Sequence, residues 1–299
     1  MPRVIALGFF DGVHIGHAAL LARARERADA LGASAAALTF DRHPDELVTG
    51  KSVPLINSRA DREWLLREKF HMDEVLLLHF DRETMHMPWR SFAEDYLIGK
   101  LGASHLVCGH DFRFGDRGEG DPERLSALCA GLGVGCDVVG RVELDGRTVS
   151  STYIRQLLSG GDVEQAARYL GHPHLLSGTV VPGKQLGRTI GIPTANIYAP
   201  DGVLLPRFGV YAARVTLPDG RAYPAVTNVG VRPTVEDQTG ITVEPWLLGF
   251  DGDLYGRRIR VEFFRYLRGE TKFPDLAALR AAILKNAAET RAFFQERGI

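Results

Sequence analysis

Two histidines, His14 and His17, stand where an apolar run gives way to a helix-like run, within ALGFFDGVHIGHAALLARAR at positions 6–25. Three glycines accompany them: Gly8, Gly12 and Gly16. A glycine-rich turn from strand to helix exposes backbone N–H groups at the positive end of the helix, which suits a phosphate group. Two imidazoles at that point can donate hydrogen bonds to phosphate oxygens and stabilise charge that builds up during group transfer. The alternatives are a metal site, for which no third ligand of matching spacing is visible, and ordinary packing. The glycines do not form GxGxxG, which weakens a dinucleotide-binding interpretation.

A second stretch, VSSTYIRQLL at positions 149–158, also fits an anion. It offers three residues that favour a helix N-terminus, Ser150, Ser151 and Thr152, and then places Arg155 in the first turn. Hydroxyl groups, free amides and a guanidinium could converge on one phosphate. The alternative is an ordinary capped helix with a solvent-exposed arginine.

The second half of the chain offers a different set of polar residues. GTVVPGK at 178–184 matches the spacing of a Walker A loop, but Gln185 replaces the required Ser or Thr, Pro182 removes an N–H group, and no helix pattern follows. In PTAN, the oxygens of Thr194 and Asn196 could bind a hard cation, or the segment could be a simple turn. In the predicted strand ITVEPWLLGF, alternation places Glu244 and Trp246 on one face. A solvent-exposed glutamate is the alternative for Glu244.

Two kinds of secondary structure must position these residues. In the first half, predicted strands at 4–10, 35–40, 74–79, 105–109 and 135–142 alternate with helices at 17–31, 59–70, 89–101 and 122–133. This alternation predicts a parallel sheet covered on both faces, with ligands beyond the carboxyl ends of its strands. After about residue 160, short strands punctuated by Pro and Gly predict a small antiparallel barrel, closed by a helix over 275–297.

Composition excludes several classes of protein. A chain of 299 residues with 45% hydrophobic content predicts two domains, and a net charge of −1 gives no broad attraction to nucleic acid or to a membrane surface. Cys108, Cys129 and Cys136 lack CxxC spacing, so we expect inert free thiols. No apolar run approaches the length of a membrane span and no leader pattern is visible. We therefore expect an unprocessed cytoplasmic protein.

Several motifs in this order resemble one family. They are HIGH at 14–17, GHDFRFG at 109–115, SSTYIR at 150–155, GTVVPGKQLGRTIGIPTANI at 178–197, NVGVRPT at 228–234 and FDGDLYGRRIRVEFFRYLR at 250–268. The chain is similar, over nearly its whole length, to the bifunctional riboflavin kinase/FAD synthetase family of bacteria. The resemblance implies an α/β Rossmann-like nucleotidyltransferase domain with a parallel sheet, followed by a small antiparallel β-barrel domain with a C-terminal helix. It places an FMN adenylyltransferase domain at 1–170 and a riboflavin kinase domain at 171–299.

The resemblance also assigns roles to residues. In the first domain, AMP passes from ATP to the phosphate of FMN, with His14, His17 and Arg155 as catalytic residues. The phosphates of ATP are bound there by Gly8, Phe10, Asp11, Gly12, Gly16, Ser150, Ser151 and Thr152, and the flavin by Asp111, Phe112 and Arg113. In the second domain, ATP is bound by the glycine-rich loop containing Gly183, Lys184, Gly187, Arg188 and Gly191. Thr194 and Asn196 hold Mg²⁺, and Glu244 is the catalytic carboxylate that acts on riboflavin.

The chain departs from the family pattern in the kinase half and near the first motif. Trp246 stands where the family commonly has His, Gly249 where it has Asp or Asn, and Phe9 where it often has Asn. Two alternative functions therefore stay open: an FAD synthetase with a weakened or inactive kinase domain, and a non-catalytic flavin-binding regulatory protein. The expected partners are riboflavin, FMN, FAD and ATP, without nucleic acid or membrane, and a weak homo-oligomer is left open.

Overall fold

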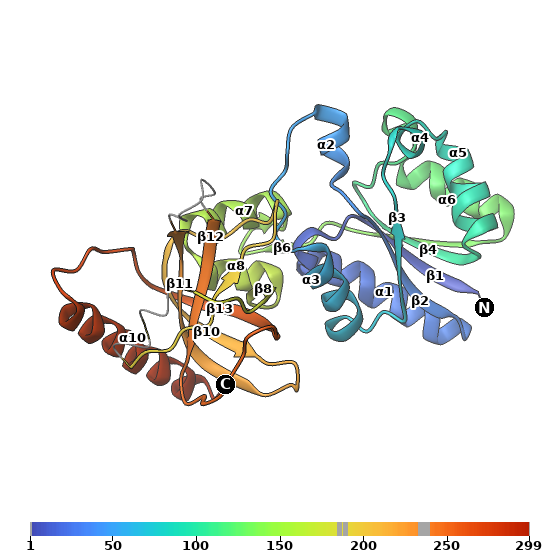
Figure 1. The fold of residues 1–299 in the computed structure, drawn as a ribbon. Coiled ribbons are helices and arrows are strands. Elements are labelled where there is room, and N and C mark those ends of the chain that lie inside the picture. The colour runs from blue at the N-terminus through green and yellow to red at the C-terminus, as the bar shows by residue number, and fades with distance from the viewer. Residues whose placement is uncertain (1, 184–186, 188–190, 233–239, 299) are drawn as a thin grey trace. The chain divides into compact units, whose positions relative to one another are not determined.

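The computed structural model describes residues 2–183, 187, 191–232 and 240–298. Within it the chain forms two compact units (Figure 1). The first comprises Met1–Leu55 and Arg59–Ser151, and the second comprises Ile56–Ser58 and Thr152–Ile299. No helix among the described residues combines the length and apolar character needed to cross a bilayer.

The first unit is built on a five-stranded sheet with the order β3-β2-β1-β4-β5, in which all neighbours pair in parallel. The strands are β1 (Arg3–Leu7), β2 (Ser34–Phe40), β3 (Glu74–Leu78), β4 (Ala103–Gly109) and β5 (Gly135–Val139). Apolar runs such as VIAL in β1 are buried on both faces, as expected for a parallel sheet. The predicted parallel sheet is confirmed, and its strand order reverses between β1 and β4.

Helices pack on this sheet, among them α1 (Ile15–Leu31), which contacts β1, β2 and β4, and α6 (Pro122–Leu132), which contacts β5. The unit also contains α2 (Pro44–Thr49), α3 (Arg59–Trp64), α4 (Arg82–Met85) and α5 (Trp89–Ser91), with short helical turns η1 (Asp11–Val13) and η4 (Asp116–Gly118). Two segments are π-helical: η2 (Leu65–Lys69) and η3 (Phe92–Lys100). On one face, Leu97 of η3 and Leu125 of α6 pack with Ile5 and Leu7 of β1. A small hairpin of β6 (Glu143–Leu144) and β7 (Arg147–Thr148) follows β5.

The second unit contains a six-stranded antiparallel sheet with the order β8-β13-β10-β11-β12-β9. Its elements are α7 (Ser151–Gly160), α8 (Val163–Leu170), β8 (His174–Thr179), β9 (Ile197–Tyr198), β10 (Gly209–Thr216), β11 (Ala222–Arg232), β12 (Gly240–Leu247), β13 (Arg258–Arg268) and α10 (Leu276–Arg297). An antiparallel bridge between Val181 and Asn196 joins the segments that follow β8 and precede β9, so the sheet nearly closes. The predicted small barrel is confirmed in this near-closed form.

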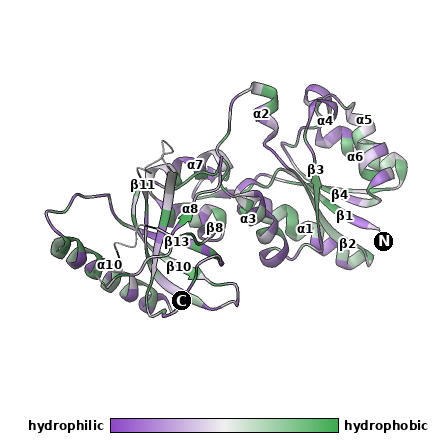
Figure 2. Ribbon diagram, in the orientation of Figure 1, coloured by the Kyte–Doolittle hydropathy of each residue, from purple (hydrophilic) through white to green (hydrophobic). Residues whose placement is uncertain are grey.

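The C-terminal helix α10 packs on the barrel and completes its core. Asp275 caps the helix by accepting a hydrogen bond from the backbone N–H of Ala278 at 2.7 Å. Ala287 and Phe294 are buried against Val210 and Ala212 of β10. Hydrophilic and hydrophobic residues both occur along α10 (Figure 2), and Leu276 and Leu284 are exposed to solvent. The pattern over 275–297 therefore predicted this element correctly.

A buried histidine makes the stability of the second unit sensitive to acid. His174 of β8 is 0% exposed, is stacked on Phe263, and has no hydrogen-bond partner for either ring nitrogen among the described residues. Burial lowers its pKa to about 3. In the unfolded chain the imidazole becomes protonated once the pH falls below its ordinary pKa. In the folded unit it becomes protonated only when the pH has fallen to about 3.

We therefore expect the unit to lose stability as the pH falls below about 6.5, by about 1.4 kcal/mol per pH unit from this group. Urea unfolding of the full chain at several pH values measures the loss. In His174→Leu, the slope of unfolding free energy against pH should be smaller by that amount. An equal slope in the two proteins would contradict the assignment.

Candidate active sites in the two units

A strained turn after β1 carries the histidine motif. Phe10 and Val13 have positive φ angles of 58° and 41°, as does Gly12 with 78°. The left-handed region is unfavourable for a β-branched residue such as Val13, and strain of this kind concentrates at functional sites. The predicted strand 4–10 accordingly ends at Leu7. The turn places His14 at the N-terminus of α1, at the point where the order of the sheet reverses.

The two histidines form a stacked pair. Their ring centroids are 3.6 Å apart and the rings are inclined by 11°. Nδ1 of His14 accepts a hydrogen bond of 3.2 Å from the backbone N–H of His17 and so caps the helix. A neutral His14 must therefore carry its proton on Nε2. A Cβ atom at Gly16 would lie 3.1 Å from the His14 ring, so a larger residue there would require the ring to shift.

His17 is neutral at physiological pH. Desolvation lowers its pKa well below the ordinary value, and the nearby rings and charges of His14 and Arg62 lower it further. Its Nδ1 is buried and has no hydrogen-bond partner among the described residues. A neutral imidazole donates one N–H and accepts at its other nitrogen, so His17 can hold a phosphate oxygen without a positive charge of its own.

A cavity of about 280 Å³, which we call the histidine cavity, opens at the carboxyl ends of β1, β4 and β5. Of the residues predicted from the sequence, it brings together Gly8, His14, Gly16, His17, Asp111, Phe112, Ser150 and Ser151. It is also lined by His110 and Arg141, which follow β4 and β5. Imidazole, hydroxyl and helix N-terminal N–H groups in one cavity match the needs of a polyphosphate.

Other residues predicted to bind phosphate lie outside this lining. Phe10 and Asp11 are buried beneath the turn, and the carbonyl oxygen of Asp11 accepts a hydrogen bond of 3.0 Å from Oγ of Ser151. This hydrogen bond joins the turn to the serine motif. Gly12 lies in the turn between Phe10 and Val13, the two strained residues. Thr152 and Arg155 belong to the second compact unit. Their predicted roles stay predictions.

An aromatic cavity of about 470 Å³ adjoins the histidine cavity, since Phe112 lines both. Five phenylalanines line it: Phe40, Phe80, Phe92, Phe112 and Phe114. The rings of Phe112 and Phe114 are stacked, with centroids 5.3 Å apart. Arg113, predicted to bind flavin, lies at this cavity. Phe40 ends β2 and Phe80 follows β3, so a strand-end rule applied to every aromatic residue could have found them.

In the second unit, Glu244 lines a cavity of about 310 Å³, which we call the glutamate cavity. Pairing of β11 with β12 places Glu244 opposite Asn228, and Oγ1 of Thr242 donates a hydrogen bond of 2.8 Å to Oε1 of Glu244. That bond fixes the carboxylate in one orientation. Trp246 lines the same cavity, as the predicted alternation requires. Further lining comes from Gly187, Thr194, Asn196, Val210, Arg268 and Phe273.

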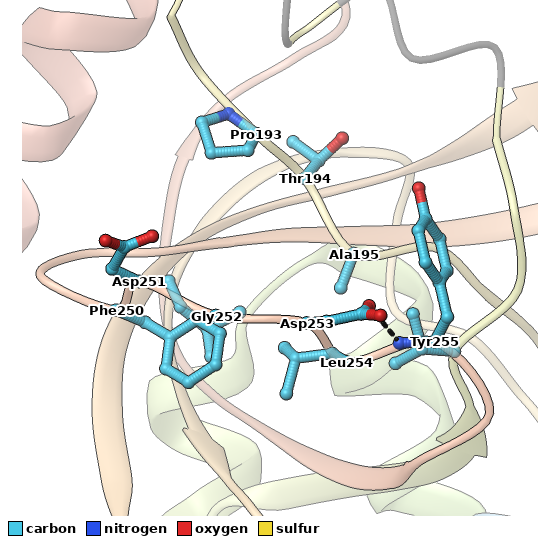
Figure 3. Close-up of a pocket in the computed structure, with 11 residues that line it drawn as sticks. Pro193, Thr194, Ala195, Phe250, Asp251, Gly252, Asp253, Leu254 and Tyr255 are labelled. Atoms are coloured by element: carbon cyan, nitrogen blue, oxygen red, sulfur yellow. Dashed lines mark hydrogen bonds between the residues drawn. The ribbon is translucent and has the colours of Figure 1, made fainter.

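A fourth cavity of about 360 Å³ adjoins the glutamate cavity and shares Thr194 with it. We call it the loop cavity because Pro193, Thr194 and Ala195 line one side and the loop 250–255 lines the other (Figure 3). Asp253 orders this loop by accepting a hydrogen bond of 2.9 Å from the backbone N–H of Tyr255. The motif at 250–268 includes this loop, but no role was predicted for it from the sequence, although its Asp-Gly-Asp turn residues were a signal.

Asn196 has the properties of a cation ligand. It is 6% exposed, and its Oδ1 has no hydrogen-bond partner among the described residues. It lines the glutamate cavity together with Thr194 and Glu244, so three kinds of oxygen donor are available to a hard cation. These residues fit Mg²⁺ shared with substrate phosphates, because Mg²⁺ commonly takes few ligands from the protein itself. Within the described part of the chain, no group of three His, Cys, Asp or Glu residues forms a metal-binding cluster.

The glycine-rich loop supports Asn196 at close range. A Cβ atom on Gly183 would lie 2.5 Å from Nδ2 of Asn196, and one on Gly187 would lie 2.1 Å from the carbonyl oxygen of Ile192. Gly191 has a φ of 74°, which favours glycine. Lys184 and Arg188, predicted to bind ATP, lie outside the described residues.

We expect Gly183→Ala to displace the Asn196 side chain and to raise the KM for magnesium ATP in the reaction of the second unit at least 10-fold. The reaction of the first unit should be unchanged. Steady-state kinetics of both reactions on one preparation measure this. Gly160→Ala is the control for the change of residue type, because no atom lies within 4 Å of the added Cβ and its φ is not positive. Equal kinetics for Gly183→Ala and the wild type would contradict the close-packing argument.

One unit has a parallel sheet and a cavity whose donors suit phosphate oxygens, and the other is a near-barrel in which a carboxylate and Asn196 line one cavity. These features are typical of a two-site, nucleotide-dependent transferase. A family model described as FAD synthetase matches residues 1–153, and one described as riboflavin kinase matches residues 170–294. The chain belongs to the bifunctional riboflavin kinase/FMN adenylyltransferase family.

Relatives of that name match nearly the whole chain. Those from Pseudomonas fluorescens and Escherichia coli K12 are 39% and 37% identical, each over 97% of this chain and 92% of the relative. The relative from Listeria monocytogenes is 33% identical over 98% of this chain and 92% of its own length. The fold is similar to a crystal structure titled a macrolide-efflux protein from Streptococcus pneumoniae, with a TM-score of 0.85, 29% identity, and coverage of 97% of this chain and 94% of that one.

Proposed function

We propose that the second unit transfers the γ-phosphoryl group of ATP to riboflavin, giving FMN and ADP, and that the first unit transfers AMP from ATP to FMN, giving FAD and pyrophosphate. One observation supports this above the others: each unit holds two adjoining cavities that share a single residue, Phe112 or Thr194. A two-substrate transfer needs two such cavities, with the reacting groups meeting at the junction.

In the first unit, we assign the aromatic cavity to the flavin ring and the histidine cavity to ATP. Stacked phenylalanine rings suit the flat isoalloxazine, whereas imidazole and hydroxyl donors suit phosphate oxygens. A phosphate oxygen of FMN attacks the α-phosphorus in line, and pyrophosphate leaves. No protein nucleophile is needed, so His14 and His17 act by donating hydrogen bonds to oxygens that gain charge. Arg155 is assigned to the leaving pyrophosphate.

In the second unit, we assign the glutamate cavity to riboflavin and the loop cavity to the nucleotide. The Glu244 carboxylate accepts the proton of the ribityl hydroxyl group, whose oxygen then attacks the γ-phosphorus of ATP. Thr242 holds the carboxylate for this task through its 2.8 Å hydrogen bond. Thr194 and Asn196 would hold Mg²⁺, which when bound would neutralise charge on the phosphate oxygens.

Incubation of the purified full chain with riboflavin, ATP and Mg²⁺, followed by chromatography of the products, tests the proposal. Formation of FMN and FAD together is expected. FAD formation only from supplied FMN would indicate an inactive kinase unit, and absence of both products would refute the catalytic proposal. The same proposal includes a functional boundary near residue 170 and a weak homo-oligomer. It also includes a cytoplasmic location, which the three free thiols support.

A further inference from the structure

Arg62 lies on α3 and, among the residues that the structure describes, is the largest fully buried side chain, at 0% exposure. The centre of its guanidinium lies 4.4 Å from the centroid of the Phe9 ring, and Nη2 donates a hydrogen bond of 2.6 Å to the carbonyl oxygen of Phe40. Nε and Nη1 have no hydrogen-bond partner among the described residues. Burying an arginine with unsatisfied donors lowers the free energy of unfolding, so this arginine does not serve the stability of the fold alone.

The contacts of Arg62 meet at the strand ends beneath the histidine motif. Phe9 follows β1 and precedes the strained turn, and its carbonyl oxygen accepts a hydrogen bond of 2.7 Å from Oγ1 of Thr39. The Phe9 ring also contacts the ring of His43, with centroids 4.7 Å apart. Phe40 lines the aromatic cavity. Arg62 thus contacts both the segment that leads into the turn and Phe40, which lines the aromatic cavity.

The charge of Arg62 acts on this same region. Desolvation lowers its pKa to about 10, so the guanidinium stays charged at neutral pH, with Asp11 of η1 as its strongest attractive partner. Glu63 and Asp41 also attract it, and Arg59 repels it. The charged and titratable groups around His17 are His14, Asp11 and Arg62, together with His110, Asp111 and Arg141 of the histidine cavity.

We propose that Arg62 is a positioning residue for adenylyl transfer: its buried guanidinium holds the Phe9–Asp11 segment in place and supplies a fixed positive charge near His17. The inference rests on the proposed function of the first unit. It explains why a phenylalanine can stand at position 9, since an aromatic ring covers the guanidinium favourably. Arg62 does not line any of the four cavities, so it acts through the turn and through His17.

The charge has a consequence that can be measured. A positive charge near an imidazole opposes its protonation, so loss of the Arg62 charge should raise the pKa of His17. The acid limb of the adenylylation pH profile should then move to higher pH. The same change should appear directly in the NMR titration of His17 in isotope-labelled protein.

Two variants of the full chain separate charge from shape. Arg62→Gln removes the charge, and Arg62→Lys keeps it but loses the planar group that stacks on Phe9. We expect both to lower kcat for FMN adenylylation at least 10-fold with little change in the KM for ATP, and the acid limb and the His17 titration to move in Arg62→Gln alone. Arg67→Gln is the matched control, because it removes a charge by the same change at an exposed position in the next helical segment. Riboflavin phosphorylation by each variant reports on intact folding of the second unit.

Wild-type kcat in Arg62→Gln, or a loss confined to the KM for ATP, would overturn the proposal, as would a His17 titration that does not move. If Arg62→Gln does not fold, Arg62→Lys decides, and wild-type kcat there would overturn it. Absence of FAD formation by the wild-type protein would instead overturn the proposed function of the first unit.

Discussion

We expect Glu244→Gln to lower FMN formation from riboflavin by about 10²- to 10⁴-fold, the usual contribution of a general base. Glutamine preserves the size of the side chain and can still accept the hydrogen bond from Thr242, but it cannot take up the proton of the attacking hydroxyl group. The loss should appear in kcat, whereas the KM for riboflavin should change little. Initial rates with saturating ATP and Mg²⁺, followed by chromatography, measure it.

FAD formation from supplied FMN is the internal control for Glu244→Gln. It should be unchanged, because every residue that lines the histidine and aromatic cavities belongs to the first compact unit. Glu296→Gln, on the exposed side of α10, serves as the matched control for the change in charge. Loss of both activities in Glu244→Gln would argue against separate sites.

The second large effect is expected at the other end of the chain. His17→Ala should lower FAD formation from FMN by about 10²- to 10³-fold, the range found when one donor to a developing charge is removed. The ring of His17 is stacked on His14 and meets Phe10 edge to face, with centroids 5.2 Å apart, so its removal also loosens the His14 ring. Single-turnover measurements with FMN and ATP would separate slower chemistry from weaker binding.

FMN formation by His17→Ala should match that of the wild type. His79→Ala tests whether loss of any histidine from the first unit has the same effect, since His79 is largely exposed and lies outside all four cavities. Normal FAD synthesis by His17→Ala would refute the role assigned to the histidine pair.

The sequence predicted the architecture well because hydrophobic periodicity reports directly on burial. The runs in β1 and β2 predicted a parallel sheet, and the spacing over 275–297 predicted α10. Ends of elements were less predictable. Strand β1 ends at Leu7, short of the predicted residue 10, because the chain enters a turn in which the backbone at Phe10 is left-handed. Periodicity carries no information about such a turn. Nor does it distinguish the π-helical segments at Leu65–Lys69 and Phe92–Lys100 from α-helix.

Residues that act through tertiary packing escaped the sequence analysis. Arg62 stands in RADREWLLREK, where an arginine reads as solvent exposed, and only the fold shows that it is buried against Phe9. The phenylalanines of the aromatic cavity come from four separate segments, so no motif unites them. The motif residues themselves, such as His14 and Asn196, could be proposed from the sequence because their chemistry is visible in their type and spacing.

The assignment of each cavity pair to a single compact unit has a consequence for the history of such chains. Damage to the lining of one pair leaves the lining of the other untouched, so natural selection can retain or discard each chemical step on its own. In a cell that obtains FMN from outside, selection would not act against substitutions of Glu244 or Asn196, but it would still act against substitutions of the histidine pair.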